Sequence, residues 1–291
     1  MYNDSPRRIV VQEFFKLLYG DQPAGWTITG PKENIHKMSR TDFIDYRNRH
    51  YVASATTVII SGRIDEKETL KKVSGIFKAS GTWKREAKRK VIESQVAPEV
   101  TVFYKDTDQT HIIIGNRSFD VYNRYNPIIR VLDGILSGMS GRLFQKMREE
   151  LGICYYVSPD NDAFTDHGVF TVSAGVDSKR VKEAIAAILT ELRKLKTELV
   201  SKEELDKVKN YLIGNMYLGL ESSDSVANFY GGQEILKEKL KTPEDIVKEI
   251  KAVTPAEIKY VAERIFKNET LNLAIVGKFK EKKEFLDVLK F

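Results

Sequence analysis

The residues that could hold a catalytic metal ion are the four histidines, His36, His50, His111 and His167. No two of them lie three or four residues apart, and none stands in an H-E-x-x-H or H-x-x-E-H arrangement. A catalytic zinc ion needs three protein ligands that converge on it at about 2 Å. Scattered histidines provide no local core for such a site, so we expect this chain to bind no metal by itself.

Other catalytic motifs are equally incomplete. There is no G-x-S-x-G motif, no Walker loop and no dinucleotide fingerprint. The stretch Ser137–Gly141 resembles a phosphate-binding turn, but it lacks the lysine and hydroxyl residue that would follow, so we expect only a tight turn. Cys154 lies between Ile153 and Tyr155 and is interpreted as a small buried hydrophobic residue. We therefore expect no cysteine nucleophile.

The segment from Gly138 to Val157, GMSGRLFQKMREELGICYYV, resembles the C-terminal half of the pitrilysin/insulinase family. These zinc peptidases carry the inverted H-x-x-E-H motif and include processing peptidases. Family members typically show Gly-Met-Ser-Ser-Arg-Leu-Phe. This chain departs from that pattern with Gly141 for the second serine and Ile153-Cys154 for leucine-alanine. The resemblance extends along essentially the whole chain.

The resemblance implies a substrate-binding role for Arg148 and Tyr155, because the family has an arginine and a tyrosine at this seven-residue spacing. Peptide hydrolysis in the family uses metal-bound water and donors for the developing oxyanion. A guanidinium and a phenol on neighbouring elements could hydrogen-bond the peptide backbone. Composition alone favours an arginine on a solvated helix face and a tyrosine at a core edge; the family context favours substrate contact. His111, at the start of an apolar strand, is expected to be a satisfied core-edge residue.

The elements that position this pair follow from hydrophobic periodicity and capping signals. Helices are expected over 6–19, 39–51, 65–77, 126–136 and 141–150, and after Asp177, Ser201, Ser222, Thr242 and Thr254. Strands are expected over 56–60, 100–104, 110–117, 153–158, 168–174 and 271–276, with a turn at 160–162. Strand pairs followed by segregated helices predict an α+β fold with a mostly antiparallel sheet.

An internal repeat indicates two related modules. Residues 39–62 align without gaps over residues 254–277, at an offset of 215 (254 − 39), and each copy reads as a capping box, a helix, an apolar run and a glycine. We expect residues 1–80 to be the C-terminal part of a first module, 81–98 a charged linker and 99–291 a complete second module. The first module is thus expected to be incomplete at its N-terminus.

The offset and the resemblance together place the family's three zinc ligands upstream of Met1. The chain is then expected to be the substrate-binding C-terminal part of a zinc-dependent endopeptidase, inactive alone, with zinc in the complete enzyme. Its expected partners are a peptide or unfolded polypeptide and the missing N-terminal half or a zinc-bearing subunit, with self-association of the isolated chain. The alternatives are a natural non-catalytic subunit that pairs with a zinc-bearing partner, and a purely structural scaffold.

Composition excludes several other classes of protein. The 291 residues carry a net charge of +6 with both signs interleaved, and the basic cluster at 84–90 lacks interleaved stacking aromatics, so nucleic-acid binding is not expected. Apolar runs are too short to span a bilayer, and the first residues have no signal-peptide pattern. A single cysteine suits a reducing compartment. The expected location is the cytoplasm.

Overall fold

The computed structural model describes residues 4–77, 88–236 and 239–291. The chain divides into two compact units. The first unit contains Met1–Trp26, Lys90–Met216 and Thr242–Phe291, and the second contains Thr27–Arg89 and Tyr217–Lys241. These units follow contacts in space, whereas the module boundaries at 80 and 98 follow the repeat, so those boundaries stay a prediction. Residues 81–87 of the expected linker, with Lys84 and Arg85, lie outside the described residues.

The first unit is built on a five-stranded sheet within the described residues, in the order β1-β5-β2-β4-β3. Its strands are β1 (Glu99–Tyr104), β2 (Gln109–Ser118), β3 (Cys154–Ala163), β4 (Gly168–Asp177) and β5 (Asn272–Gly277). Only the β1–β5 pair is parallel, and the other three pairs are antiparallel. The expected α+β fold with a mostly antiparallel sheet is confirmed.

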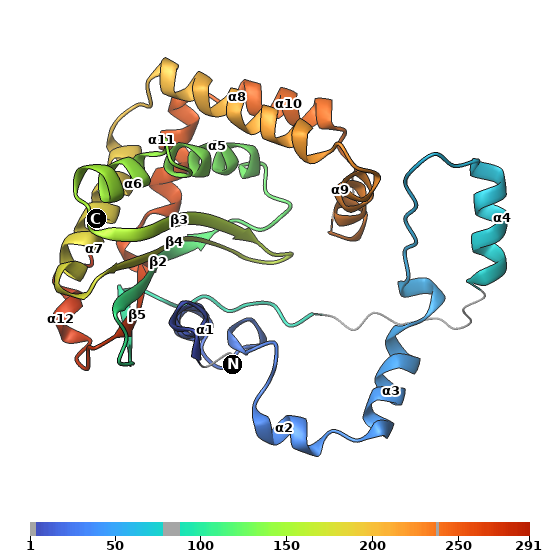
Figure 1. The fold of residues 1–291 in the computed structure, drawn as a ribbon, viewed down its shortest axis with the longest axis horizontal. Helices are drawn as coiled ribbons and strands as arrows, with labels where there is room; N and C mark the ends of the chain where they lie inside the picture. The colour runs from blue at the N-terminus through green and yellow to red at the C-terminus, as the bar shows by residue number, and fades with distance from the viewer. Residues whose placement is uncertain (1–3, 78–87, 237–238) are drawn as a thin grey trace. The chain divides into compact units, whose positions relative to one another are not determined.

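Helices cover one face of this sheet (Figure 1). The covering layer includes α5 (Asn126–Leu136), α7 (Val181–Thr197), α8 (Lys202–Gly219), α10 (Pro243–Ala252) and α11 (Pro255–Ile265). Alternate strand residues such as Ile112, Val172 and Ile275 point into this layer and are completely buried. Because side chains alternate along a strand, the intervening residues face the opposite side of the sheet.

On that opposite side lies α1 (Pro6–Tyr19) (Figure 1). Its buried residues, with Phe14 fully buried, pack on Ile113, Val169 and the alanine and valine of β5 that face away from the helix layer. Gly115 permits this close approach, since a Cβ there would lie 2.7 Å from the Phe14 ring and 2.7 Å from a backbone oxygen of β4. α1 packs mainly over β5, β2 and β1, at one side of the sheet face.

The hairpin between β3 and β4 turns later than the sequence indicates. Residues 160–162, expected to form the turn, lie inside β3 and pair with β4, so that expectation is wrong. The chain instead reverses at Phe164–His167, where the Phe164 amide donates to the His167 carbonyl over 2.9 Å. The aspartates are compatible with a strand here because their side chains lie on a solvent-exposed part of the sheet face.

The second unit contains α2 (Lys32–Lys37), α3 (Arg40–His50), α4 (Glu66–Ile76) and α9 (Ser223–Leu236). The predicted strand at 56–60 is wrong: this segment is irregular. A strand exists only when paired, and no other strand occurs among the described residues of this unit. Val58, Ile59 and Ile60 consequently remain 37–44% exposed.

The repeat is visible in local structure. Ser39 and Thr254 each form a capping box. The hydroxyl oxygen of each accepts a hydrogen bond from the backbone amide of the third helical residue, and the backbone amide of each donates to the carboxylate of that residue. Shifting α1 by the offset of 215 places it over 221–234, which is nearly the span of α9. α1 packs on β5, and in the same way Gly231 of α9 lies against Ile59, the counterpart of Ala274 in β5. The two halves of the repeat therefore use corresponding helices.

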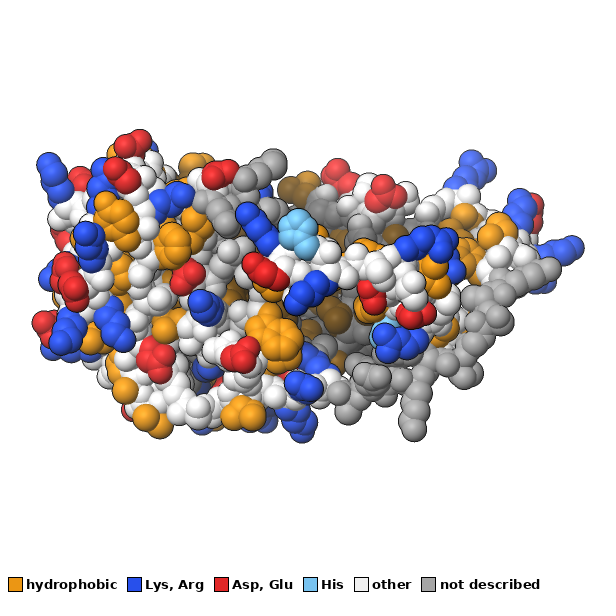
Figure 2. Space-filling view, turned by 90° about the horizontal axis from the view of Figure 1, so that it is seen from below, with side chains coloured by type: hydrophobic (Ala, Val, Ile, Leu, Met, Phe, Trp, Pro, Cys, Tyr) orange, Lys and Arg blue, Asp and Glu red, His pale blue; other side chains and the backbone are white. Residues whose placement is uncertain are grey.

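Charged side chains show no segregation on the face seen in Figure 2, where basic and acidic groups lie interspersed. Within the described residues, no helix is long and apolar enough to cross a membrane.

Candidate functional site

Tyr155 occupies a β-bulge at the start of β3. Cys154 pairs with Val176 and Tyr156 pairs with Gly175, so Tyr155 is the extra residue in the strand. Without it, Cys154 and Tyr156 would face the same side of the sheet. With it, Cys154 is buried under the helix layer, whereas Tyr156 faces the α1 side. The Tyr155 side chain is 61% exposed.

Arg148 lies in η4 (Gln145–Glu150), a π-helix that follows α6 (Arg142–Phe144). The expected helix over 141–150 is therefore helical, but it is divided into a short α-helix and a π-helix and is not one regular α-helix. π-Helical turns are rare and are frequently found at functional sites. Met147 is completely buried and anchors the turn to the core, while its neighbour Arg148 is exposed. Gly152, with φ of +59°, ends the turn and returns the chain to β3.

A hydrogen bond joins the π-helix to the bulge. Arg148 Nη1 donates to the carbonyl oxygen of Cys154 over 2.7 Å. The guanidinium is thereby held beside the backbone that leads into Tyr155, and its other N–H groups remain capable of donating to a ligand. The structure thus brings Arg148 next to the Tyr155 bulge, with both side chains exposed.

Cys154 and His111 behave as structural residues. Cys154 is 3% exposed, and burial raises the pKa of its thiol although Arg148 acts in the opposite direction. A thiol with a raised pKa is a poor nucleophile at neutral pH. His111 Nδ1 lies 3.0 Å from the Tyr156 hydroxyl, and burial followed by the charge of Arg7 lowers its pKa. His111 is accordingly the hydrogen-bonded core-edge residue that its sequence position indicates.

The turn before the π-helix is fixed by glycines and an ion pair. Gly138 has φ of +77°, and a Cβ at Gly141 would lie 2.2 Å from the Ser137 carbonyl oxygen. This close approach explains the glycine at 141. Arg142 then donates two hydrogen bonds, of 2.7 and 2.6 Å, to the carboxylate of Glu204. The backbone amide of Glu204 donates to the Ser201 hydroxyl at the start of α8, while its carboxylate binds Arg142 and does not return to Ser201.

Two polar features were not found by sequence reasoning. One is the Arg142–Glu204 pair, which joins positions 62 residues apart and has no local signal. The other is a pair of carboxylates, Asp160 and Asp162, on the face of β3 that Tyr156 shares. Their alternate spacing in the sequence is compatible with one face of a strand, whereas their residue types favour a turn.

No group of three or more histidine, cysteine, aspartate or glutamate residues that could hold a metal ion occurs among residues 4–77, 88–236 and 239–291. His36 and His50 belong to the second unit, and His111 and His167 belong to the first. His167 Nδ1 is 2.7 Å from the carboxylate of its neighbour Asp166, and its ring stacks on Phe164.

Residues 37–212 match the family described as the peptidase M16 inactive domain. The uncharacterized zinc protease YmxG of Bacillus subtilis is 27% identical over 279 residues, which cover 95% of this chain and 67% of that protein. A protease structure from Helicobacter pylori superposes with a TM-score of 0.84 at 19% identity, covering 94% of this chain and 67% of that one. A peptidase M16 inactive domain from Pseudomonas fluorescens gives 0.81 at 16% identity, covering 97% and 68%. The chain spans about two thirds of the length of these proteins.

Proposed function

Because the chain belongs to the peptidase M16 inactive-domain family, we propose that it is the substrate-holding part of a zinc-dependent peptidase, with Arg148 and Tyr155 as the residues that contact the peptide. The observation that carries this proposal is the hydrogen bond from Arg148 Nη1 to the Cys154 carbonyl. It holds an exposed guanidinium beside the backbone that leads into Tyr155, whose side chain is also exposed. Bulges re-aim side chains next to functional sites.

The two side chains would bind a peptide by hydrogen bonding. Arg148 would donate to a backbone carbonyl of the peptide, and the Tyr155 hydroxyl would donate to a second one. In the assembled enzyme, such donors also stabilise the carbonyl oxygen as negative charge develops on it during hydrolysis. A bound zinc ion would supply activated water there. The described residues of this chain do not fit a zinc site, and no role proposed for Arg148 or Tyr155 requires one on this chain.

Arg148→Ala is expected to weaken the binding of a fluorescent extended peptide about tenfold or more, because a hydrogen bond to a charged group contributes ~1.5–3 kcal/mol. Tyr155→Phe removes one hydroxyl and is expected to weaken binding about three- to tenfold. Fluorescence anisotropy with the purified chain measures both effects. Arg130→Ala and Tyr122→Phe are matched controls, since both residues are exposed and belong to the same unit. If the control variants lose as much peptide affinity as the site variants, or if the site variants lose none, the proposal is contradicted and a structural scaffold is favoured.

The second unit supports a proposal about the partner. Residues 56–62 correspond by the repeat to residues 271–277, which contain β5, a strand fully buried between β1 and β2. Here the corresponding valine and isoleucines are partly exposed and unpaired. We propose that this segment becomes a strand when it pairs with a zinc-bearing half, and that without this partner it drives self-association. Exposed, unpaired apolar segments are prone to such pairing.

Size-exclusion chromatography with light scattering is expected to show oligomers of the isolated chain at micromolar concentration. Ile60→Lys places a charge in the unpaired segment and is expected to shift the chain towards monomer. Ile76→Lys is the matched control, because Ile76 is 76% exposed on α4, outside the segment. A wild-type chain that is monomeric at all concentrations would refute self-association.

A further inference from the structure

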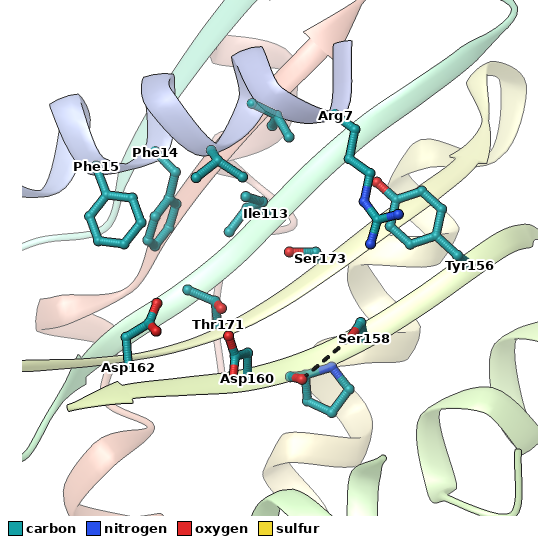
Figure 3. A pocket seen from close by; sticks show the side chains of 13 residues that line it. Arg7, Phe14, Phe15, Ile113, Tyr156, Ser158, Asp160, Asp162, Thr171 and Ser173 are labelled. Carbon is teal, nitrogen blue, oxygen red and sulfur yellow. Dashed lines mark hydrogen bonds between the residues drawn. The ribbon is translucent and has the colours of Figure 1, made fainter. Parts of the chain in front are cut away.

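A cavity of about 300 Å³ lies between α1 and the β3–β4 side of the sheet (Figure 3). One wall is apolar and comes from α1, with Val11, Phe14 and Phe15. The facing surface is polar and comes from the two strands, with Ser158 and Ser173 among its hydroxyl groups. The cavity exists because α1 packs over the other strands of the sheet. It is therefore amphipathic, with an apolar wall facing a polar one.

Two carboxylates, Asp160 and Asp162, lie on the polar side of the cavity. Neither forms a hydrogen bond or an ion pair with any residue that the structure describes. Arg7 is the cation that lines the cavity, but its guanidinium lies over the Tyr156 ring, 4.5 Å from the centroid. Figure 3 shows Arg7 beside Tyr156 and apart from both aspartates.

The negative charge of Asp160 affects the pKa of two nearby aspartates. Burial, and then the charge of Asp160, raises the pKa of Asp162. The charge of Asp160 also contributes to raising the pKa of Asp133, after burial of that residue. Both aspartates are exposed to solvent and no cation pairs with them among the described residues, so a basic group that entered the cavity could form charge-assisted hydrogen bonds with them.

The bulge at Tyr155 determines which residues reach the cavity. Residues 156, 158, 160 and 162 share one face because side chains alternate along the strand. The extra residue sets that face towards α1 and not towards the helix layer. The same local feature therefore exposes Tyr155 and directs both carboxylates into the cavity. Asp160 and Asp162 follow Tyr155 by five and seven residues, or roughly 16 and 23 Å along an extended strand.

We propose that this cavity is a subsite for a lysine or arginine side chain of the peptide held at Arg148 and Tyr155, an inference that rests on the proposed function. The aliphatic stem of the basic residue packs against Phe14 and Phe15, and its charged end bonds to Asp160 and Asp162. An extended peptide that follows β3 carries this residue about five to seven positions from the one that contacts Tyr155. The cavity adds selectivity to a site whose other contacts are with the peptide backbone.

The test uses 15-residue fluorescent peptides that differ at a single scanned position, with lysine in one series and the uncharged isostere norleucine in the other. Binding to the 291-residue chain is measured by fluorescence anisotropy. The lysine peptide is expected to bind about tenfold more tightly at one or two neighbouring positions only, and high salt is expected to reduce this preference. D160N/D162N is expected to abolish the preference and to leave norleucine-peptide affinity unchanged. Asp206→Asn, an exposed aspartate on α8, is the matched control and is expected to retain the preference.

Equal affinity for lysine and norleucine peptides at every position of the wild-type chain would overturn the subsite. A lysine preference that persists in D160N/D162N would overturn it as well. The proposed function fails by a different result, namely that Arg148→Ala leaves norleucine-peptide binding unchanged. Absence of any peptide binding by the wild-type chain would overturn both. The comparison of lysine and norleucine peptides uses only the wild-type chain, so its result does not depend on whether a variant folds.

Discussion

Asp133→Asn is expected to stabilise the protein at pH 7 by about 2–3 kcal/mol. Asp133 lies in α5, and one of its carboxylate oxygens is buried without a hydrogen-bond partner among the described residues. Burial, followed by the charge of Asp160, raises the pKa of Asp133 to about 6, whereas a hydrogen bond from Ser137 acts in the opposite direction. Each unit of pKa shift corresponds to about 1.4 kcal/mol between the two protonation states.

The effect depends on pH in a defined direction. Because the pKa of Asp133 is higher in the folded chain than in the unfolded chain, the folded state binds more protons between about pH 4 and pH 6. Asp133 therefore destabilises the fold progressively as the pH rises through this interval. Asparagine does not ionise, so the stability difference between the variant and the wild type is expected to be near zero at pH 4 and to reach its full size above pH 6.

Urea unfolding of both proteins at a series of pH values measures this difference directly, because other titrating groups are common to both. Asp206→Asn, which removes one negative charge at an exposed position of α8, serves as the control for the change in charge. A difference for Asp133→Asn that is constant with pH would contradict the assignment.

Phe14→Ala is expected to lower the free energy of unfolding by about 3–5 kcal/mol, the usual range for deleting a fully buried aromatic ring. Phe14 is completely buried between α1 and the sheet, where it meets the strand at Gly115. The strands are also packed into the larger core on the helix-covered face, so we expect them not to move into the cavity that the variant leaves. Denaturant unfolding gives the magnitude, and hydrogen exchange should show loss of protection in α1 before the rest of the unit.

The control for this prediction is Val11→Ala on the same helix. Val11 is 40% exposed, and alanine has the higher helix propensity, so little change in stability is expected. A loss below about 1 kcal/mol for Phe14→Ala would mean that α1 is not held to the sheet as described. Since α1 forms the apolar wall of the cavity, loosening it is also expected to reduce the preference for lysine peptides.

α1 thus links the repeat to the candidate site. It belongs to the first half of the repeat, yet it packs on the sheet of the second half and completes the cavity beside β3. Its counterpart α9 meets residue Ile59 in the other unit. If residues 56–62 form a strand on pairing with a partner half, α9 would cover that strand as α1 covers β5. Partner binding would then add a paired strand beneath α9 in the second unit.

Much of the local structure was predictable from the sequence because its causes are local. The capping boxes at Ser39, Thr242 and Thr254 each depend on residues three positions apart, and the structure confirms all three. The helices that follow them, and the apolar strands of the first unit, carry clear periodic patterns. The spacing of Arg148 and Tyr155 was also visible, although their proposed role came from a family resemblance and not from the spacing.

Tertiary structure decided the features that depend on distant partners. Residues 56–60 have the apolar character of a strand, yet they remain irregular because a strand requires a neighbour to pair with. Residues 160–162 resemble a turn in composition, but pairing with β4 over the whole length of β3 holds them extended. In both cases the conformation depends on whether a neighbouring strand is present to form backbone hydrogen bonds, and not on the local preference of the residues.

The sequence by itself determined the order of the elements, the repeat and the family to which the chain belongs. Only the tertiary structure decided that Tyr155 stands in a bulge, that Arg148 bonds to the backbone beside it, and that Asp160 and Asp162 face a cavity under α1. The physical reason is the two-residue period of a strand. One extra residue exchanges the faces of all residues that follow, and its position is set by pairing with another strand, which no local pattern in the sequence records.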